Sequence, residues 1–315
     1  MNPLRDALAR YVAVRRALGT KLQEPARTLG QFVDFLESQG AKFITTELAL
    51  RWAMQPKDVQ RATWARRLSM VRRFAAWLSA ADPRTQVPPD RLISGRRQRN
   101  PPHIFMDDEV RRLMIEASRL SSSKRLRAHT YKTLIGLLAT TGLRPGEVLA
   151  LARLDVNLQT GILFIRETKF GKSRFVPVHE STRIALMRYA QRRDRMGLHL
   201  RTDAFFVTET GFSLEASTVR RTFAKLSQTV GLRPMGARKR IGRGPRLQDF
   251  RHSFTTRKLV EWYQAGLDVA RELPKLSTYL GHSDVAHTYW YISAVPELLQ
   301  LATKYLYGRR PGGAR

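Results

Sequence analysis

The chain has 315 residues, of which 56 are basic and 26 acidic, and its formal net charge is +30. Apolar residues make up 43% of the sequence, which is enough to fill hydrophobic cores and excludes a wholly disordered chain. Both halves are basic, and such a surface favours a polyanionic partner, usually nucleic acid. Arg outnumbers Lys by 44 to 12, which suits phosphate recognition, although a GC-rich genome also raises the number of Arg codons.

Cysteine is absent, which excludes disulfide frameworks, cysteine-ligated zinc, iron–sulfur clusters and a thiolate nucleophile. Charged residues interrupt every apolar run before it reaches membrane-spanning length, and the N-terminus lacks the apolar core of a signal peptide. We therefore expect a soluble, intracellular protein without membrane contact.

The first eighty residues have helical periodicity. The apolar spacing predicts helices over residues 4–18, 25–36 and 59–79, and a short helix that is capped by Thr46 and reaches Trp52. The 59–79 helix carries one apolar stripe, formed by Trp64, Leu68, Val71, Phe74 and Trp77. Its other faces are rich in arginine, which indicates phosphate contacts or, alternatively, a solvated surface; the candidate DNA contacts are Arg66, Arg67, Arg72 and Arg73.

The composition changes after residue 82. Residues 83–103 are rich in Pro and Arg and show no apolar periodicity, which predicts a basic, Pro-stiffened linker. This linker separates a helical domain of residues 1–82 from a second domain of residues 104–307. Residues 308–315 are basic and rich in Gly, and we expect them to form a disordered tail.

The second domain is predicted to be mainly α-helical with one small β-sheet. A helix begins at Asp107 or Asp108, and two strand-like runs, 162–166 and 174–178, flank a turn. Helical patterns also cover residues 130–141, 181–196, 217–230 and the chain from 249 onward. Six basic residues fall within 233–246 and predict a basic loop, in which the candidate DNA contacts are Arg238, Lys239, Arg240 and Arg243.

The segment TGLRPGEVLAL, residues 141–151, contains the first constellation with chemical meaning. Pro145 suits the first position of a helix, so Arg144 is expected at the helix N-terminus, with Glu147 in the first turn. An arginine fork beside a helix N-terminus can bind an anion. Taken alone, the segment is better explained by a structural Arg–Glu pair.

Two further segments follow in order, RLQDFRHSFTT (246–256) and YLGHSDVAHTYWYI (279–292). With these segments the chain resembles the tyrosine recombinase, or phage integrase, family. The family pattern combines an Arg in TGLRxxE, a Lys in a β-hairpin about 25 residues later, H-x-x-R-H, L-G-H, and a Tyr nine residues after that last His. The matching positions are Arg144, Lys169, Arg251, His282 and Tyr291, and the resemblance covers residues 104–307.

The resemblance implies a mainly α fold, with a helical SAM-like N-terminal core-binding domain and a catalytic domain that contains a small antiparallel sheet. It also implies cleavage of a DNA phosphodiester without a cofactor, and the sequence has no carboxylate cluster of the kind that holds a catalytic metal. Arg144 and Arg251 would neutralise charge on the nonbridging oxygens, and Glu147 would orient the pocket.

By the same resemblance, Tyr291 would attack the phosphorus, form a 3′-phosphotyrosine and release a 5′-hydroxyl. Lys169 would protonate the departing oxygen, and His282 would hydrogen-bond the phosphate. Each of the two reactive positions has a neighbour as an alternative: Tyr289 for the nucleophile, and Lys172 for the acid. The spacing favours Tyr291 and Lys169, with Lys172 as a phosphate or solvent contact.

One position departs from the family pattern, because Gln248 replaces the first His of H-x-x-R-H. Glutamine can donate a hydrogen bond to a phosphate oxygen but cannot accept the tyrosine proton. General-base catalysis at this position is therefore in doubt, while the reaction class is unchanged. His252, next to Arg251, is expected to be structural.

The resemblance implies a bacterial, cytoplasmic, site-specific recombinase or integrase that acts on double-stranded DNA and lies on the nucleoid when bound. It also implies a tetramer, formed by this chain alone or together with related recombinases. The segment 288–302 is similar to recombinases of transposable elements, which favours a mobile-element role. A helix over 295–306 would pack either on its own domain or, as analogy with the family favours, on a neighbouring subunit. The alternatives are a type IB topoisomerase-like enzyme and a non-catalytic DNA-binding relative.

Overall fold

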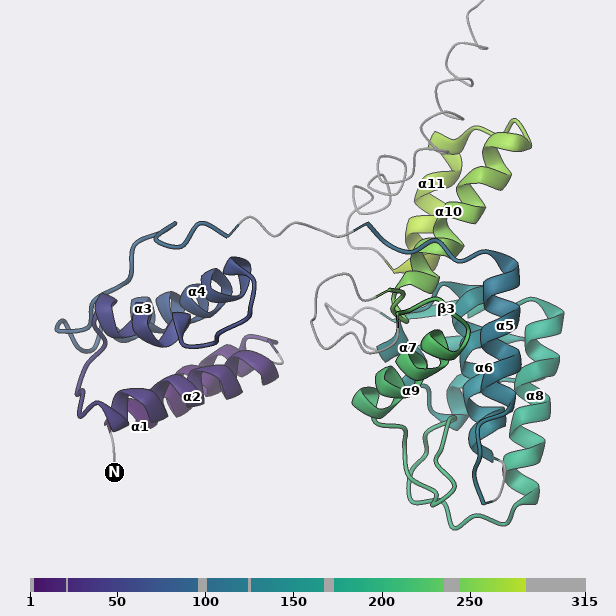
Figure 1. Cartoon of the computed structure of the whole chain (residues 1–315), viewed down its shortest axis with the longest axis horizontal. Coiled ribbons are helices and arrows are strands. Elements are labelled where there is room, and N and C mark those ends of the chain that lie inside the picture. Colours follow the sequence, from purple (N-terminus) through teal and green to yellow (C-terminus); the bar gives the residue numbers. More distant parts are fainter. Residues whose placement is uncertain are drawn as a thin grey trace, which may run out of the picture. The chain divides into compact units, whose positions relative to one another are not determined.

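The computed structural model in Figure 1 describes residues 3–20, 22–95, 101–123, 126–166, 173–234 and 244–281. The chain divides into two compact units, residues 1–100 and 101–315. Both units are mainly helical, as predicted, and the second contains a three-stranded antiparallel sheet. Within these ranges, no helix has both the length and the apolar character needed to cross a membrane.

In its described part, the first unit consists of α1 (Pro3–Ala17), α2 (Gln23–Ser38), α3 (Thr46–Met54) and α4 (Arg61–Leu78). Large aromatic side chains fill its core, each at most 1% exposed: Phe32, Trp52 and Phe74. The prediction that Thr46 caps α3 is wrong by one residue. Thr45 is the cap, since its side chain accepts a hydrogen bond from the backbone N–H of Leu48 at 3.2 Å. Two adjacent threonines have the same capping chemistry, so the sequence does not distinguish them.

The arginines of α4 have different surroundings. The guanidinium of Arg67 lies 3.7 Å from the ring centroid of Trp52 and donates to the Trp52 carbonyl at 3.0 Å, and burial lowers its pKa. It therefore stabilises the core of its own unit. Arg66 and Arg73 are exposed, and Arg66 forms an ion pair with Glu24. The predicted contacts of these residues with DNA stay predictions.

Arg72 joins α4 to the segment predicted as a linker. Its guanidinium donates to the carbonyls of Pro88 at 2.8 Å and Pro89 at 2.9 Å. In the same segment, the backbone N–H of Gln86 donates to the carbonyl of Ile44 at 2.8 Å. The first half of residues 83–103 is thus folded onto the helices of the first unit.

The second unit contains α5 (Asp107–Ser118), α6 (Leu126–Thr141), α7 (Pro145–Leu149), the 3₁₀ turn η1 (Arg153–Asp155), β1 (Val156–Asn157), β2 (Ile162–Ile165), β3 (Arg174–Pro177), α8 (Glu180–Arg195), α9 (Ala216–Thr229), α10 (Asp249–Gln264) and α11 (Val269–Leu280). Helix α6 is central, because it packs against α5, α8 and α10. Figure 1 shows α5, α6 and α8 side by side, with the sheet and α7 at one end of α6. The end of α6 therefore leads directly into the TGLR segment.

The sheet has the order β1-β2-β3, and β2 pairs antiparallel with β3 through Phe164 opposite Phe175 and Ile165 opposite Arg174. The sequence predicted β2 and β3 but not β1, which has only two residues. Strand residues alternate between faces, so Arg174 shares the inner face with the buried Val176, while Phe175 points outward and is 69% exposed.

Candidate active site

The TGLR segment forms a tight turn between α6 and α7. Gly142 has φ +62°, and a Cβ on it would lie 2.6 Å from a ring carbon of Phe254, so both the backbone conformation and the packing require glycine. Arg144 is the residue before α7 and Pro145 is its first residue, as predicted. The turn thus fixes where the Arg144 side chain leaves the backbone.

Glu147 binds Arg144 in two ways. The backbone N–H of Arg144 donates to Oε2 at 3.0 Å, and its guanidinium donates through Nη1 to Oε1 at 2.8 Å. The Arg144 side chain is 31% exposed and that of Glu147 only 8%. The predicted Arg–Glu pair is therefore present, with the carboxylate buried and the guanidinium partly accessible.

A second arginine, Arg174 of β3, also binds Glu147. Its Nη2 donates to Oε2 at 2.9 Å and its Nη1 to Oε1 at 3.3 Å, and its side chain is 10% exposed. Burial raises the pKa of Glu147, but the hydrogen bond from Arg174 and those from Arg144 outweigh burial and hold this pKa below its ordinary value. Glu147 is therefore an anion at neutral pH.

Arg251 lies on α10 and is 1% exposed. Its Nη1 donates to the carbonyl of Gly142 at 3.1 Å, and its Nη2 donates to the carbonyl of Leu280 at 2.8 Å. The structure thus brings the second motif arginine to the turn that carries the first, although 107 positions separate Arg144 from Arg251 in the sequence.

Three arginines bind three consecutive carbonyls at the end of α11. Arg174 donates through Nε to Tyr279 at 2.8 Å, Arg251 donates to Leu280 at 2.8 Å, and Arg144 donates to Gly281 at 3.4 Å. The last carbonyls of a helix have no partner within the helix and carry partial negative charge, so cations are favoured there. Leu280 and Gly281 of the LGH motif are thereby held against Arg144 of the TGLR segment and Arg251 of α10.

Gln248 directly precedes α10, one helical turn before Arg251, and it is partly exposed. The spacing of three residues between Gln248 and Arg251 is that of the H-x-x-R-H pattern. His252 is partly buried, and burial lowers its pKa to about 4, with a smaller opposing effect from Asp249. Its imidazole is neutral at physiological pH, which agrees with the expected structural role.

Tyr279 belongs to the YLGH segment and is a third tyrosine near the motif. Its ring stacks on Phe254 with centroids 5.7 Å apart, and burial raises its pKa to about 12. A buried phenol of this kind ionises with difficulty. Tyr279 is therefore a packing residue.

Several predicted residues lie outside the described ranges. They are Lys169, Lys172, His282, Tyr289 and Tyr291, together with the loop residues Arg238, Lys239, Arg240 and Arg243. In the sequence, His282 directly follows Gly281, and Lys169 precedes Arg174 by five residues. Of the predicted catalytic residues, the structure thus describes Arg144, Glu147, Gln248 and Arg251, and it adds Arg174, which binds Glu147.

Arg174 was not among the residues predicted from the sequence. The available signal was the alternation of β3, because a charged residue on the same face as a buried Val176 needs a buried partner. Glu147 supplies that partner from 27 positions away.

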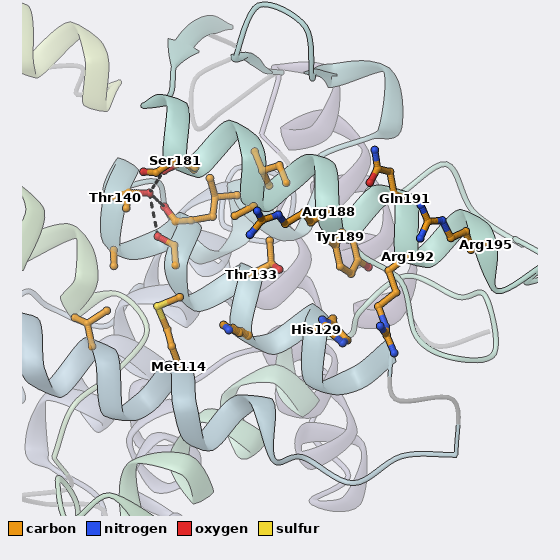
Figure 2. A pocket seen from close by; sticks show the side chains of 18 of the residues that line it. Met114, His129, Thr133, Thr140, Ser181, Arg188, Tyr189, Gln191, Arg192 and Arg195 are labelled. Atoms are coloured by element: carbon orange, nitrogen blue, oxygen red, sulfur yellow. Dashed lines mark hydrogen bonds between the residues drawn. The ribbon is translucent and has the colours of Figure 1, made fainter.

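A separate groove of about 860 Å³ opens between α6 and α8, with Met114 of α5 at its side (Figure 2). Its lining includes His129 and Thr133 of α6 and Arg188 and Arg192 of α8. None of the motif residues that the structure describes lines this groove. Among the described residues, no group of three or more His, Asp or Glu side chains is placed to hold a metal ion.

Residues 104–297 match the phage integrase family. The putative integrase/recombinase y4rB of Sinorhizobium fredii is 44% identical over 310 residues, which cover 97% of this chain and 98% of that protein. The chain belongs to the phage integrase family. It is a tyrosine-type site-specific recombinase, an enzyme that breaks and rejoins DNA strands.

The recombinase is also similar to the tyrosine recombinase XerD of Caulobacter vibrioides, with 30% identity over 256 residues that cover 80% of this chain and 77% of that protein. These relatives support the predicted recombinase and not the topoisomerase-like or non-catalytic alternatives.

Solved structures confirm the predicted fold. The Tn1549 transposon integrase in complex with transposon right end DNA matches with a TM-score of 0.66 and 16% identity over 97% of this chain and 99% of that chain. The XerH site-specific recombinase in a post-cleavage complex with palindromic difH substrate matches with a TM-score of 0.60 and 19% identity, covering 90% of this chain and 78% of that chain.

Proposed function

We propose that the recombinase cleaves duplex DNA at the cluster formed by Arg144, Glu147 and Arg251. The observation that carries this proposal is the convergence of the two motif arginines on the TGLR turn and the end of α11. A phosphodiester under in-line attack gathers negative charge on its nonbridging oxygens, and fixed guanidinium groups stabilise such charge best.

The two arginines have different tasks in this proposal. Arg144 is partly exposed and meets the phosphate first. Arg251 is buried, so its contact with a phosphate oxygen requires that the guanidinium become accessible when DNA binds. Each terminal nitrogen of arginine carries two N–H groups, so a phosphate contact can be added to a carbonyl contact.

The remaining steps are assigned to the residues that match the family pattern. The cationic pocket favours the ionised phenol of Tyr291, whose proton passes to water; the phenolate attacks the phosphorus in line, a 3′-phosphotyrosine forms, and the bond to the 5′ oxygen breaks. Lys169 gives a proton to that oxygen, which leaves as a 5′-hydroxyl. His282 and Gln248 donate hydrogen bonds to the phosphate. Attack by the 5′-hydroxyl of a second strand then restores a phosphodiester and frees the tyrosine.

We further propose that the biological context is a mobile element, with a tetramer on two DNA sites as the active assembly. The Tn1549 protein is a transposon integrase bound to transposon right end DNA, and the likeness of its fold supports this context. Phosphate contacts by Arg66 and Arg73 of the first unit would add to the affinity without reading sequence. Lys172 and the basic residues of 238–243 are assigned the same role.

The test is the formation of a covalent adduct. A suicide duplex, nicked so that the cleaved 5′ end diffuses away, is incubated with the recombinase, and the products are separated under denaturing conditions. The DNA that flanks the gene is first searched for inverted repeats, and the substrate is built from them. We expect an adduct through the 3′ phosphate; a DNA-bound protein that forms no adduct on these ends would contradict the proposal.

A further inference from the structure

We propose that Arg174 is a positioning residue of this recombinase, which neutralises Glu147 so that the charge of Arg144 remains available for the scissile phosphate. This inference rests on the proposed function of Arg144, since it explains how that arginine is kept ready.

Glu147 accepts hydrogen bonds from both Arg144 and Arg174. Its Oε2 accepts from Arg174 at 2.9 Å and from the backbone N–H of Arg144 at 3.0 Å. Its Oε1 accepts from the Arg144 guanidinium at 2.8 Å and from Arg174 at 3.3 Å. Both carboxylate oxygens thus have two donors, and only one of these four bonds uses the Arg144 guanidinium.

The charges of Arg174 and Glu147 compensate each other. Both side chains are nearly buried, 10% and 8% exposed, so water screens their interaction little. Arg144 is then left with an uncompensated charge at the accessible side of the cluster. Without Arg174, the carboxylate would pair with Arg144 alone and would compete with the phosphate for that guanidinium.

Arg174 also links three elements of the fold. It donates to the Tyr279 carbonyl at 2.8 Å, so one guanidinium joins β3, the start of α7 and the end of α11. These three elements lead to Lys169, Arg144 and His282 in the sequence. A shift of about 1 Å in a catalytic group can slow a reaction on the order of 10²-fold, so this link has consequences for the rate.

The experiment compares Arg174→Gln, Arg174→Lys and the double variant Arg174→Gln/Glu147→Gln with the wild type in single-turnover cleavage of the suicide duplex. Two substrates are used: the ordinary phosphodiester, and a methylphosphonate in which a neutral methyl group replaces one nonbridging oxygen at the scissile position. DNA affinity and thermal unfolding are measured for each protein.

We expect Arg174→Gln to cleave the phosphodiester on the order of 10²-fold more slowly at saturating DNA. The deficit should be much smaller on the methylphosphonate, because that substrate needs less positive charge. Removing the competing carboxylate in the double variant should recover part of the rate, and Arg174→Lys should retain more activity than Arg174→Gln.

Arg193 provides the matched control. It is a 3% exposed arginine of the same unit, paired with Asp194 and donating to the Phe205 carbonyl at 2.8 Å. Arg193→Gln should lower the unfolding temperature without a substrate-dependent loss of cleavage. An equal deficit of Arg174→Gln on both substrates, or a double variant slower than the single one, would refute the inference. Absence of the adduct in the wild type would instead refute the proposed function.

Discussion

The guanidinium of Arg174 occupies the space that a side chain at position 281 would need. A Cβ on Gly281 would lie 2.6 Å from Nη1 and 2.8 Å from the central carbon of that guanidinium. Gly281 also has φ +69°, as is usual for the residue that ends a helix. The glycine of the LGH motif is therefore required both by the end of α11 and by the arginine packed against it.

Gly281→Ala is expected to lower stability and to slow cleavage. The positive φ alone costs a side-chain-bearing residue about 1–2 kcal/mol, and displacement of Arg174 adds to this cost. Gly266 is the control, because it has φ +68° but no atom within 4 Å of a built Cβ. Gly266→Ala should show the loss of stability without the loss of single-turnover rate. Equal rates for the two variants would contradict the packing argument.

The site shows which features a single sequence can predict. Pro145 and Glu147 lie within three residues of Arg144, so the helix start and the ion pair followed from local rules. The partners of Arg251 are carbonyls 109 and 29 positions away, which no local pattern encodes. The family pattern supplied the pairing of these segments instead.

Residues 83–103 show what a sequence pattern does not encode. Their Pro and Arg content predicted a Pro-stiffened linker, but Arg72 binds the carbonyls of Pro88 and Pro89 and holds that stretch on α4. Neither the composition of a segment nor its lack of apolar periodicity shows whether its backbone carbonyls find hydrogen-bond donors on a neighbouring helix.

Tyr291→Phe should abolish the covalent adduct and leave DNA affinity nearly unchanged, because only the nucleophilic hydroxyl is lost. Denaturing gels of the suicide reaction and a binding titration check this. Tyr289→Phe is the control: on the helix that the sequence predicts here, residues two apart point about 200° apart, so only one can face the phosphate. An adduct that survives Tyr291→Phe and disappears in Tyr289→Phe would show that the spacing argument is wrong.

Lys169→Ala should stall cleavage, because the departing 5′ oxygen loses its proton donor. A substrate with sulfur at the 5′ bridging position should restore the rate, since a thiolate leaves without a proton. Lys172→Ala should cleave both substrates at similar relative rates. If the sulfur substrate rescues Lys172→Ala and not Lys169→Ala, the general acid lies three residues further along the chain.

The ionised state of Glu147 predicts an acid-sensitive contribution to stability. Its pKa is lowered in the folded protein, so the stabilisation is present above the unfolded pKa of about 4.3 and is lost as the pH falls through the lower folded value. At pH 7, Glu147→Gln should cost about 1.5–3 kcal/mol, and this difference should shrink in acid.

Denaturant titrations between pH 7 and pH 3 measure this contribution. The control is Glu261→Gln, which changes a carboxylate that is 47% exposed and paired with Lys258 on the surface. An exposed pair contributes at most about 1 kcal/mol, so this variant should stay close to the wild type throughout. A Glu147→Gln difference that is constant with pH would contradict the assigned ionisation.

The last prediction concerns Gln248, where the chain departs from the family pattern. If Gln248 donates one hydrogen bond to the charged phosphate, Gln248→Ala should raise the barrier to cleavage by about 1.5–3 kcal/mol. Gln248→His should keep or increase the rate, because an imidazole can donate the same bond and can also accept a proton. The increase should be seen near and above neutral pH, where the imidazole is unprotonated.

Single-turnover cleavage of the suicide duplex from acid to mildly alkaline pH compares the wild type with both variants. Gln248 lies one turn before Arg251 and is partly exposed, so a side chain at this position is able to reach a phosphate bound at the cluster. A fully active alanine variant beside an inactive histidine variant would place Gln248 outside the pocket. The start of α10 would then be a structural cap, and the family's first histidine would have no counterpart in this chain.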